Sequence, residues 1–373
     1  MSMFRRRLLI YQALMNKSDV ISYPGLIAAW SAKGKTNDDE DRAILKDLTG
    51  NGHDITLNGF AFSEMSGYGG YKYLFNKSYY AFSGCSYTQN NSKNNIILNT
   101  TGGTFDLRIP GSNENQSWDE YKLKITGLND GDYITFHGYD ENTSIELIRI
   151  SENGIYTIPQ SKRNLDEGGG LQAYIKGNTI SPTIIVIELL PEYPNALVFD
   201  GVDDYGVNNN MPILTDYTII AKREIFGNIA YSCVISKYKG DTNGAFNFDM
   251  PNYNGLNSAF SYGYQNYVEF PKNKISWMTP LNYNQQIIKK GTNVDGTNLS
   301  IGVLRGNKYF LKFAFYSAYL FDRSLDEQEI KAFIRKYIDP EYLLPSEIPT
   351  PDCYYDFSKG SNDDETRDTI KDF

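Results

Sequence analysis

Histidine and cysteine are scarce in this chain, which limits the chemistry it can carry. Its 373 residues include two histidines, His53 and His137, and three cysteines, Cys85, Cys233 and Cys353. Two histidines offer little material for a multi-histidine metal site or for a catalytic relay. Three cysteines far apart in sequence do not form a disulfide framework, so we expect them to be buried as small apolar residues.

Clusters of positive charge are also rare. The formal net charge is −9, and residues 5–7 form the one basic cluster. Because phosphate contacts need clustered lysine and arginine, the sequence argues against a nucleic-acid partner.

Long apolar runs are missing as well. The apolar run at residues 8–15 is interrupted by Gln12. It is shorter than the roughly 20 residues that a membrane span needs, and no small-residue cleavage site of a signal peptide follows it. We therefore predict no membrane span and interpret residues 1–21 as a docking tail. The alternative is an amphipathic helix on a membrane surface.

Tyrosine, phenylalanine and glycine, in contrast, are abundant, with 30, 20 and 32 residues. This composition favours strands joined by tight turns. Apolar or alternating segments at residues 26–30, 55–62, 121–125 and 183–189 have the pattern of strands. The sequence therefore predicts a mainly β fold.

One segment near the end has the pattern of a helix. Ser324 and Glu327 have the S-x-x-E spacing of a capping box, which predicts a helix start. Apolar residues then recur at the spacing of one helix face, suited to docking on a sheet: Ile330, Phe333, Ile334 and Tyr337. We expect a single C-terminal helix that caps the β fold and ends near Ile338.

The middle and the end of the chain have patterns of their own. Alternating segments and turns between residues 66 and 194 predict a smaller, separate β-sandwich. Prolines recur through residues 339–352, which predicts a stiff linker. Beyond it, the residues 362–367 echo residues 37–42, so we interpret residues 353–373 as the start of a second repeat module.

Four motifs in order carry a family resemblance. Residues 26–30, 47–53, 197–205 and 319–330 resemble elements shared by laminin-G-like (concanavalin A-like) jelly-roll domains. The resemblance implies a jelly-roll sandwich formed by residues 22–65 and 195–338, with the smaller β-sandwich at 66–194 as an insertion. It also implies a fold that often binds glycans, sometimes with calcium. It does not imply catalysis.

The whole arrangement is similar to fibre and appendage proteins of tailed bacteriophages that infect gut anaerobes. This resemblance implies a non-enzymatic structural protein of the virion that binds other virion proteins through its N-terminal tail. We expect a homo-oligomer, with a trimer as one form, that displays the jelly roll toward host surface glycans. The alternative is a carbohydrate-binding protein secreted by a bacterium or held on its surface.

A glycoside-active enzyme is a third hypothesis. Glycoside hydrolysis needs two carboxyl groups held about 5–10 Å apart across a sugar cleft. The sequence has no compact array of acidic residues on one strand, so we predict no enzymatic activity.

An acidic turn is the candidate metal site. Asp200, Asp203 and Asp204 offer hard oxygen ligands for Ca²⁺, with Asp47 or Asn51 added from an adjoining turn. The alternative is a solvated turn whose aspartates cap backbone amides. We predict no obligatory cofactor and keep calcium as the one candidate.

Aromatic residues give the candidate glycan site. A stretch rich in Asn and Gly, which we expect to form loops, contains Tyr262, Tyr264, Tyr267, Trp277 and Tyr283. Flat rings stack on the apolar faces of sugars, while neighbouring amides bind the hydroxyl groups. The alternative is that these residues serve as strand or subunit-interface residues.

Overall fold

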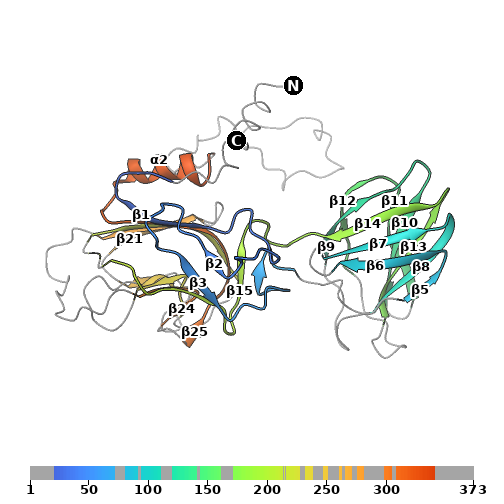
Figure 1. The fold of residues 1–373 in the computed structure, drawn as a ribbon, viewed down its shortest axis with the longest axis horizontal. Helices are drawn as coiled ribbons and strands as arrows, with labels where there is room; N and C mark the ends of the chain where they lie inside the picture. The colour runs from blue at the N-terminus through green and yellow to red at the C-terminus, as the bar shows by residue number, and fades with distance from the viewer. Residues whose placement is uncertain are drawn as a thin grey trace, which may run out of the picture. The chain divides into compact units, whose positions relative to one another are not determined.

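Strands dominate the part of the chain that the structure describes (Figure 1). The computed structural model describes residues 21–71, 80–90, 94–110, 120–140, 143–160, 171–212, 214, 216–226, 232–237, 247–250, 260–262, 265–270, 275–280, 298–304 and 308–340. The prediction of a mainly β fold with one helix near the C-terminus is confirmed for these residues. The predicted docking tail, proline-rich linker and repeat module lie outside them, apart from Ile21, Asp339 and Pro340.

Two seven-stranded sheets form the first β-sandwich, which we call the large sandwich. One sheet has the order β21-β22-β17-β26-β15-β4, with β1 also paired to β26. Its strands are β1 (Leu26–Ser31), β4 (Gly67–Tyr68), β15 (Leu197–Asp200), β17 (Thr218–Ile225), β21 (Gln265–Phe270), β22 (Ile275–Pro280) and β26 (Lys312–Phe321).

The second sheet of the large sandwich has the order β2-β3-β16-β23-β18-β19-β20. Its strands are β2 (Ile44–Leu45), β3 (Ile55–Asn58), β16 (Tyr205–Asn208), β18 (Ile235–Ser236), β19 (Asn247–Met250), β20 (Phe260–Tyr262) and β23 (Leu299–Ile301). A separate hairpin pairs β24 (Val303–Leu304) with β25 (Lys308–Phe310).

Strand β26 is the centre of the first sheet. One of its edges pairs with β17 along most of its length. Its other edge is shared, because β1 pairs with residues 317–321 and β15 pairs with residues 312–315. Strand β1 precedes the middle of the chain and β15 follows it. One long strand therefore joins the two distant parts of the sequence in a single sheet.

Apolar residues from both sheets form the core of the large sandwich. Phe199 of β15 stacks on Phe313 of β26 with ring centroids 4.4 Å apart. Trp30 of β1 is buried in the same core, and its indole Nε1 donates a hydrogen bond to the carbonyl oxygen of His53 at 2.7 Å. This polar contact lets a large aromatic ring be buried without leaving its donor unpaired.

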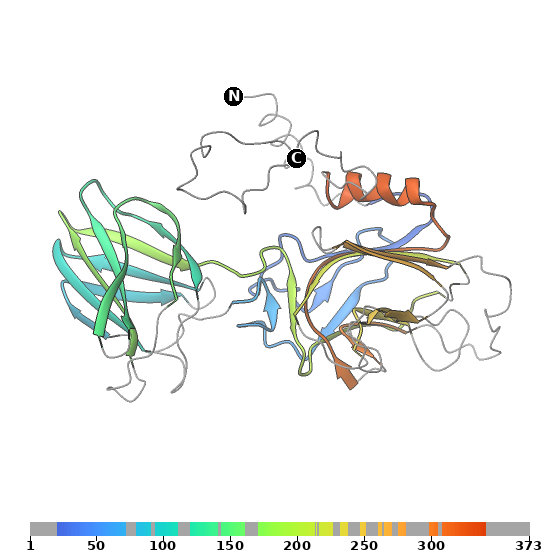
Figure 2. The same cartoon turned by 180° about the vertical axis from the view of Figure 1, so that it is seen from behind.

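Ten further strands form a second β-sandwich, which we call the small sandwich. The views in Figures 1 and 2 show its strands, cyan to green, as two facing layers. One five-stranded sheet, which we call the outer-polar sheet, has the order β11-β10-β13-β8-β5, and the other has the order β12-β9-β14-β7-β6. The strands are β5 (Tyr80–Ser83), β6 (Cys85–Asn90), β7 (Asn95–Thr100), β8 (Gly103–Pro110), β9 (Tyr121–Thr126), β10 (Tyr133–Asp140), β11 (Thr143–Ile150), β12 (Gly154–Ile158), β13 (Leu171–Thr179) and β14 (Thr183–Leu189).

The small sandwich has its own apolar core. Every second residue of its central strands is buried there, as in β9, where Tyr121, Leu123 and Ile125 alternate with exposed residues. Two chain segments lead to and from this sandwich and bind each other. The amide of Gly69 donates to the carbonyl of Ala196, and the amide of Tyr193 donates to the carbonyl of Gly69, both at 2.8 Å.

The helix α2 spans Glu327–Tyr337 and belongs to a separate compact unit, Leu325–Phe373. The predicted capping box at Ser324 is wrong, because the cap is Asp326. Its carboxylate accepts from the amide of Glu329 at 2.8 Å, and the Glu329 carboxylate accepts from the amide of Asp326 at 3.1 Å. The sequence contains two overlapping boxes, and the hydroxyl of Ser324 is already bonded to the carboxylate of Asp216.

The apolar face that was predicted for the helix is present. Ile330, Phe333 and Ile334 are buried, and Tyr337 is half-buried. Among the described residues, no helix is long and apolar enough to cross a membrane, and this includes α2.

Candidate functional site

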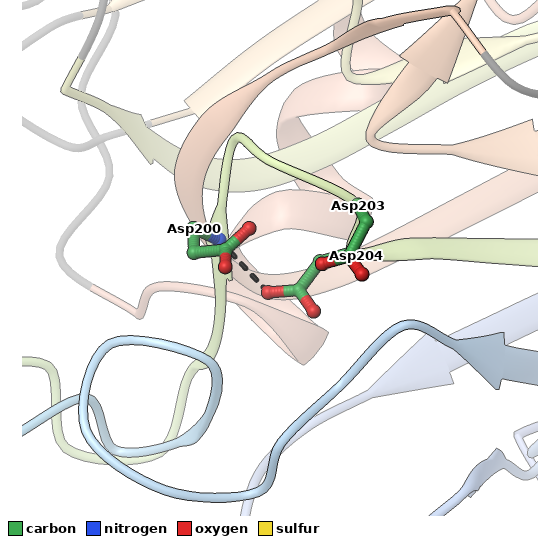
Figure 3. Close-up of side chains that lie close together, drawn as sticks. All are labelled: Asp200, Asp203 and Asp204. Carbon is green, nitrogen blue, oxygen red and sulfur yellow. Dashed lines mark hydrogen bonds between the residues drawn. The ribbon is translucent and has the colours of Figure 1, made fainter.

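The acidic turn between β15 and β16 gathers three carboxylates. Asp200 ends β15, and Asp203 and Asp204 precede β16. One carboxylate oxygen from each lies within 4.8 Å of the others. Figure 3 shows the three side chains in this turn. Carboxylate oxygens are the ligand type that Ca²⁺ prefers.

Hydrogen bonds within the turn already engage much of this donor set. Asp204 is fully buried, and its two oxygens accept from the amide of Asp200 and the hydroxyl of Ser66, both at 2.9 Å. Asp200 accepts from the amide of Val202 at 2.7 Å. These are the amide-capping bonds of the solvated-turn alternative. Calcium at Asp200, Asp203 and Asp204 stays a prediction.

Burial changes the pH at which the carboxyl group of Asp204 loses its proton. Removal from water raises the pKa of its carboxyl group from 3.8 to about 7, although the hydrogen bonds from Asp200 and Ser66 favour the charged form. The neighbouring charges of Asp200 and Asp203 add to the rise. Asp204 therefore changes charge near neutral pH.

Asp47 and Asn51 belong to a different hydrogen-bonded turn. Asp47 is not among the three carboxylates that the structure brings together. One of its oxygens accepts from the amides of Ala29 and Thr49, at 3.1 and 3.0 Å, and the other accepts from the amide of His53 at 3.1 Å. The side-chain amide of Asn51 donates to a backbone carbonyl oxygen of β1 at 2.9 Å. These contacts tie the turn to β1.

Three of the five aromatic residues lie in strands where the sequence predicted loops. Tyr262 lies in β20, Tyr267 in β21 and Trp277 in β22, so the loop prediction is wrong for these three. Strands β21 and β22 pair with each other, with Val268 opposite Trp277. The high β propensity of aromatic residues accounts for this. Tyr264 and Tyr283 lie outside the described residues, and a role in glycan binding stays a prediction for all five.

A third group of polar residues lies on the small sandwich. Strand pairing in the outer-polar sheet places them in three neighbouring rows on the side away from the core. We call this surface the polar face. Its first row contains Asp106, Lys176, Thr135 and Arg149, its second row His137 and Glu146, and its third row Tyr133 and Asn178.

Contacts between rows hold these side chains in place. The hydroxyl of Thr135 donates to the carbonyl of Lys176 at 3.3 Å and lies 2.9 Å from Nε2 of His137. The neutral ring of His137 has one donor nitrogen and one acceptor nitrogen, and its tautomer sets which partner gives the proton in this second contact. Arg149 pairs with Glu146 at 3.2 Å, and its guanidinium lies 4.6 Å from the ring centroid of Tyr133.

The charges on this face are matched. Burial lowers the pKa of His137 below its ordinary 6.5, and the charge of Lys176 acts in the same direction, so the ring is neutral at neutral pH. The hydrogen bond from Arg149 lowers the pKa of Glu146. Asp106 differs from its neighbours, since its Oδ1 is buried and has no hydrogen-bond partner.

Sequence reasoning missed the polar face, although a signal was present. In strand β10, Tyr133, Thr135 and His137 alternate with the buried Ile134 and Phe136, which is the pattern of a strand with one polar side. That pattern does not reveal which strands lie beside β10. Strand β11 follows β10 directly in sequence, but β8 and β13 are farther away along the chain.

Comparisons with known proteins give limited information. No family model and no curated protein matches the chain, so the laminin-G-like assignment stays a prediction. A solved family 29 carbohydrate-binding module, in complex with mannohexaose, is similar to it at 14% identity with a TM-score of 0.22, covering 34% of this chain and 86% of that chain.

Two larger structures are also similar. Peptide:N-glycanase F covers 67% of this chain and 97% of that chain, at 9% identity and a TM-score of 0.14. BuGH86 in complex with neoagarooctaose covers 61% of this chain and 32% of that chain, at 10% identity and a TM-score of 0.15. At such low identities and TM-scores, none of these likenesses carries an argument about function.

The role of Asp47 can be tested by Asp47→Asn. An amide keeps one acceptor oxygen and turns an NH₂ group toward a backbone donor. We expect a loss of about 1–3 kcal/mol in the free energy of unfolding, as for a broken set of buried hydrogen bonds. Urea unfolding with EDTA and with calcium should give the same loss, whereas the exposed Asp203→Asn control should lose little. A loss that appears only with calcium would instead make Asp47 a ligand.

The raised pKa of Asp204 predicts that the free energy of unfolding depends on pH. Its pKa is about 7 in the folded state and 3.8 in the unfolded state, so the folded state binds more protons between these values. Relative to Asp204→Asn, the free energy of unfolding of the natural chain should fall as pH rises from about 4 to about 7, and then level off. Urea unfolding at several pH values measures this. A difference that stays constant with pH would show that Asp204 has an ordinary pKa.

Proposed function

We propose that this chain is a carbohydrate-binding protein and that the polar face of the small sandwich is its binding surface. The observation that carries the proposal is the set of side chains fixed in three rows across four strands. Groups held on strands need little reordering when a ligand binds, which favours affinity.

The chemistry of the polar face suits sugar hydroxyl groups, which both donate and accept hydrogen bonds. The neutral ring of His137 has one donor and one acceptor nitrogen, the carboxylates of Asp106 and Glu146 are acceptors, and the exposed Lys176 is a donor. The ring of Tyr133 adds an aromatic surface beside Arg149. A few well-placed polar groups beside an aromatic ring are typical of small-ligand sites.

The polar face is tested by titrating uncharged polysaccharides into the natural chain and its variants in a calorimeter. We expect Lys176→Ala and His137→Ala each to weaken binding by about tenfold, equal to about 1.4 kcal/mol. Each removes one hydrogen-bonding group from the face.

Lys124→Ala is the matched control, because Lys124 is an exposed lysine on β9 of the opposite sheet. Its affinity should equal that of the natural chain. Binding that Trp277→Ala removes, and that Lys176→Ala leaves intact, would move the site to the large sandwich. No binding by the natural chain to any glycan would contradict the proposal.

Where the protein acts is a separate proposal. The sequence resemblance supports a non-enzymatic fibre or appendage subunit of a phage virion, in a homo-oligomer, and the alternative is a protein of the bacterial surface. Immunogold labelling of purified phage particles distinguishes these two. Gold on the particles is the expected result for a virion protein, whereas labelling confined to bacterial cells would favour the alternative.

A further inference from the structure

A bulge in β11 determines which of its side chains face outward. Residues alternate between the two sides of a regular strand, so Glu146 and Arg149, three positions apart, would lie on opposite sides. The register between β10 and β11 shifts at this point instead. Leu147 is the extra residue, and both Leu147 and Ile148 pack against the core. The bulge therefore places Glu146 and Arg149 together on the polar face.

The guanidinium of Arg149 is held from two directions. Its Nε and Nη2 donate to the two carboxylate oxygens of Glu146, at 3.3 and 3.2 Å. Its Cζ lies over the ring of Tyr133, 4.6 Å from the ring centroid. Both partners of the ion pair are exposed, and exposed ion pairs add little to the stability of a protein. The arrangement therefore matters more for the position of Arg149 than for folding.

Arg149 keeps donors that face solvent. A guanidinium has five N–H groups, and two of them bind Glu146. Among the residues that the structure describes, no other one accepts a hydrogen bond from this group. The Arg149 side chain is 56% exposed, so a ligand can approach the remaining donors from solvent.

The outer edge of the guanidinium fits two oxygens that lie side by side. One N–H of Nη1 and one of Nη2 are parallel along this edge, which is the fork that arginine presents to paired acceptors. A carboxylate offers such a pair of oxygens, but Glu146 already neutralises Arg149 and would repel a second carboxylate. Two hydroxyl groups on adjacent carbons of a sugar offer the same pair without a charge.

We propose that Arg149 determines the specificity of the polar face by donating to two adjacent hydroxyl groups of an uncharged sugar, and that Glu146 positions Arg149. This inference rests on the proposed carbohydrate-binding function. It names the chemical class of the ligand and gives two residues of the polar face separate roles.

Calorimetry of the full chain tests the ligand class. The probes are linear hexasaccharides of glucose, mannose and galactose in 1,4-linked and 1,3-linked forms, together with hexagalacturonic acid. The inner units of a 1,4-linked chain have hydroxyl groups on adjacent carbons, whereas those of a 1,3-linked chain do not. We expect at least one neutral 1,4-linked probe to bind about tenfold more tightly than its 1,3-linked form and than the acid. Equal or tighter binding of either one, or binding of none of the hexasaccharides, would overturn the inference.

Substitutions of Arg149 test the donor. Arg149→Lys keeps the charge and loses the planar fork, so affinity for the best hexasaccharide should fall about tenfold, as it should for Arg149→Ala. The melting temperature should change little, because the side chain is exposed. Tyr133→Phe keeps the aromatic ring beside the guanidinium and is the matched control, with unchanged affinity. Binding by Arg149→Lys as tight as that of the natural chain would contradict the role of the fork.

Substitutions of Glu146 test positioning. Glu146→Ala leaves Arg149 in the chain without its ion pair, so affinity should fall about tenfold. Glu146→Gln keeps one acceptor oxygen and should lose less. The double variant of Glu146→Ala and Arg149→Ala should bind as tightly as Arg149→Ala alone, because Glu146 acts through Arg149. Additive losses would instead mean that Glu146 binds the sugar itself, which would overturn its positioning role.

Glu152→Ala is the matched control for Glu146→Ala, because Glu152 is an exposed glutamate between β11 and β12. It should change neither the affinity nor the melting temperature. A merely structural role of Glu146 would lower the melting temperature and leave the affinity of the folded chain unchanged.

The two proposals can fail separately. If the natural chain binds glycans and both Arg149 variants bind them equally well, this inference is wrong and the proposed function stands. If the natural chain binds none of the hexasaccharides and none of the polysaccharides, both are wrong.

Discussion

The pairing of β26 with three strands is the constraint on which the large sandwich depends. One edge of β26 binds β17, and its other edge binds β1 and β15 in turn. Strand β1 is separated from β15 by the whole small sandwich, so these contacts close a very long loop. The entropy that is lost when a loop closes grows only slowly with loop length, which is why an insertion of this size is tolerated. Loss of β26 would remove the shared neighbour of β1, β15 and β17.

The small sandwich is independent of that constraint in its packing. It has a separate apolar core, and the paired segments around Gly69 and Tyr193 fix where the chain enters and leaves it. Because this core is formed by one side of the outer-polar sheet, the other side of that sheet does not have to be apolar. Polar side chains can then occupy it without disturbing that core, and strand register places them in the rows of the polar face.

Three aspartates show how the surroundings of a carboxylate change its hydrogen bonding and its pKa. Asp47 accepts hydrogen bonds from three backbone amides and holds a turn. Asp204 is buried with two donors, and burial still raises its pKa to about 7. Asp106 has a buried oxygen with no donor. The first two are satisfied within the protein, whereas the third lacks a donor there.

The local patterns of the sequence were sufficient for the fold class. Alternation predicted strands such as β9, and the spacing of Ile330, Phe333 and Ile334 predicted the helix face, because both depend on neighbours within a few residues. The capping residue was misassigned because two boxes overlap and Ser324 has a distant partner, Asp216. The loops predicted around Tyr267 and Trp277 are strands. That prediction gave the Asn and Gly residues of the whole stretch more weight than the β propensity of its aromatic residues.

The candidate site depended on tertiary structure. Thr135 and Arg149 meet in the local hairpin of β10 and β11, but Asp106 and Lys176 join them only through the long-range pairing of β8, β13 and β10, which no short sequence window contains. The same holds for the burial of Asp204 beside Ser66, 138 residues away in the chain. The sequence by itself determined which residues alternate and which segments are strands. Tertiary structure decided which of them meet, because hydrogen bonds between strands act across space and not along the chain.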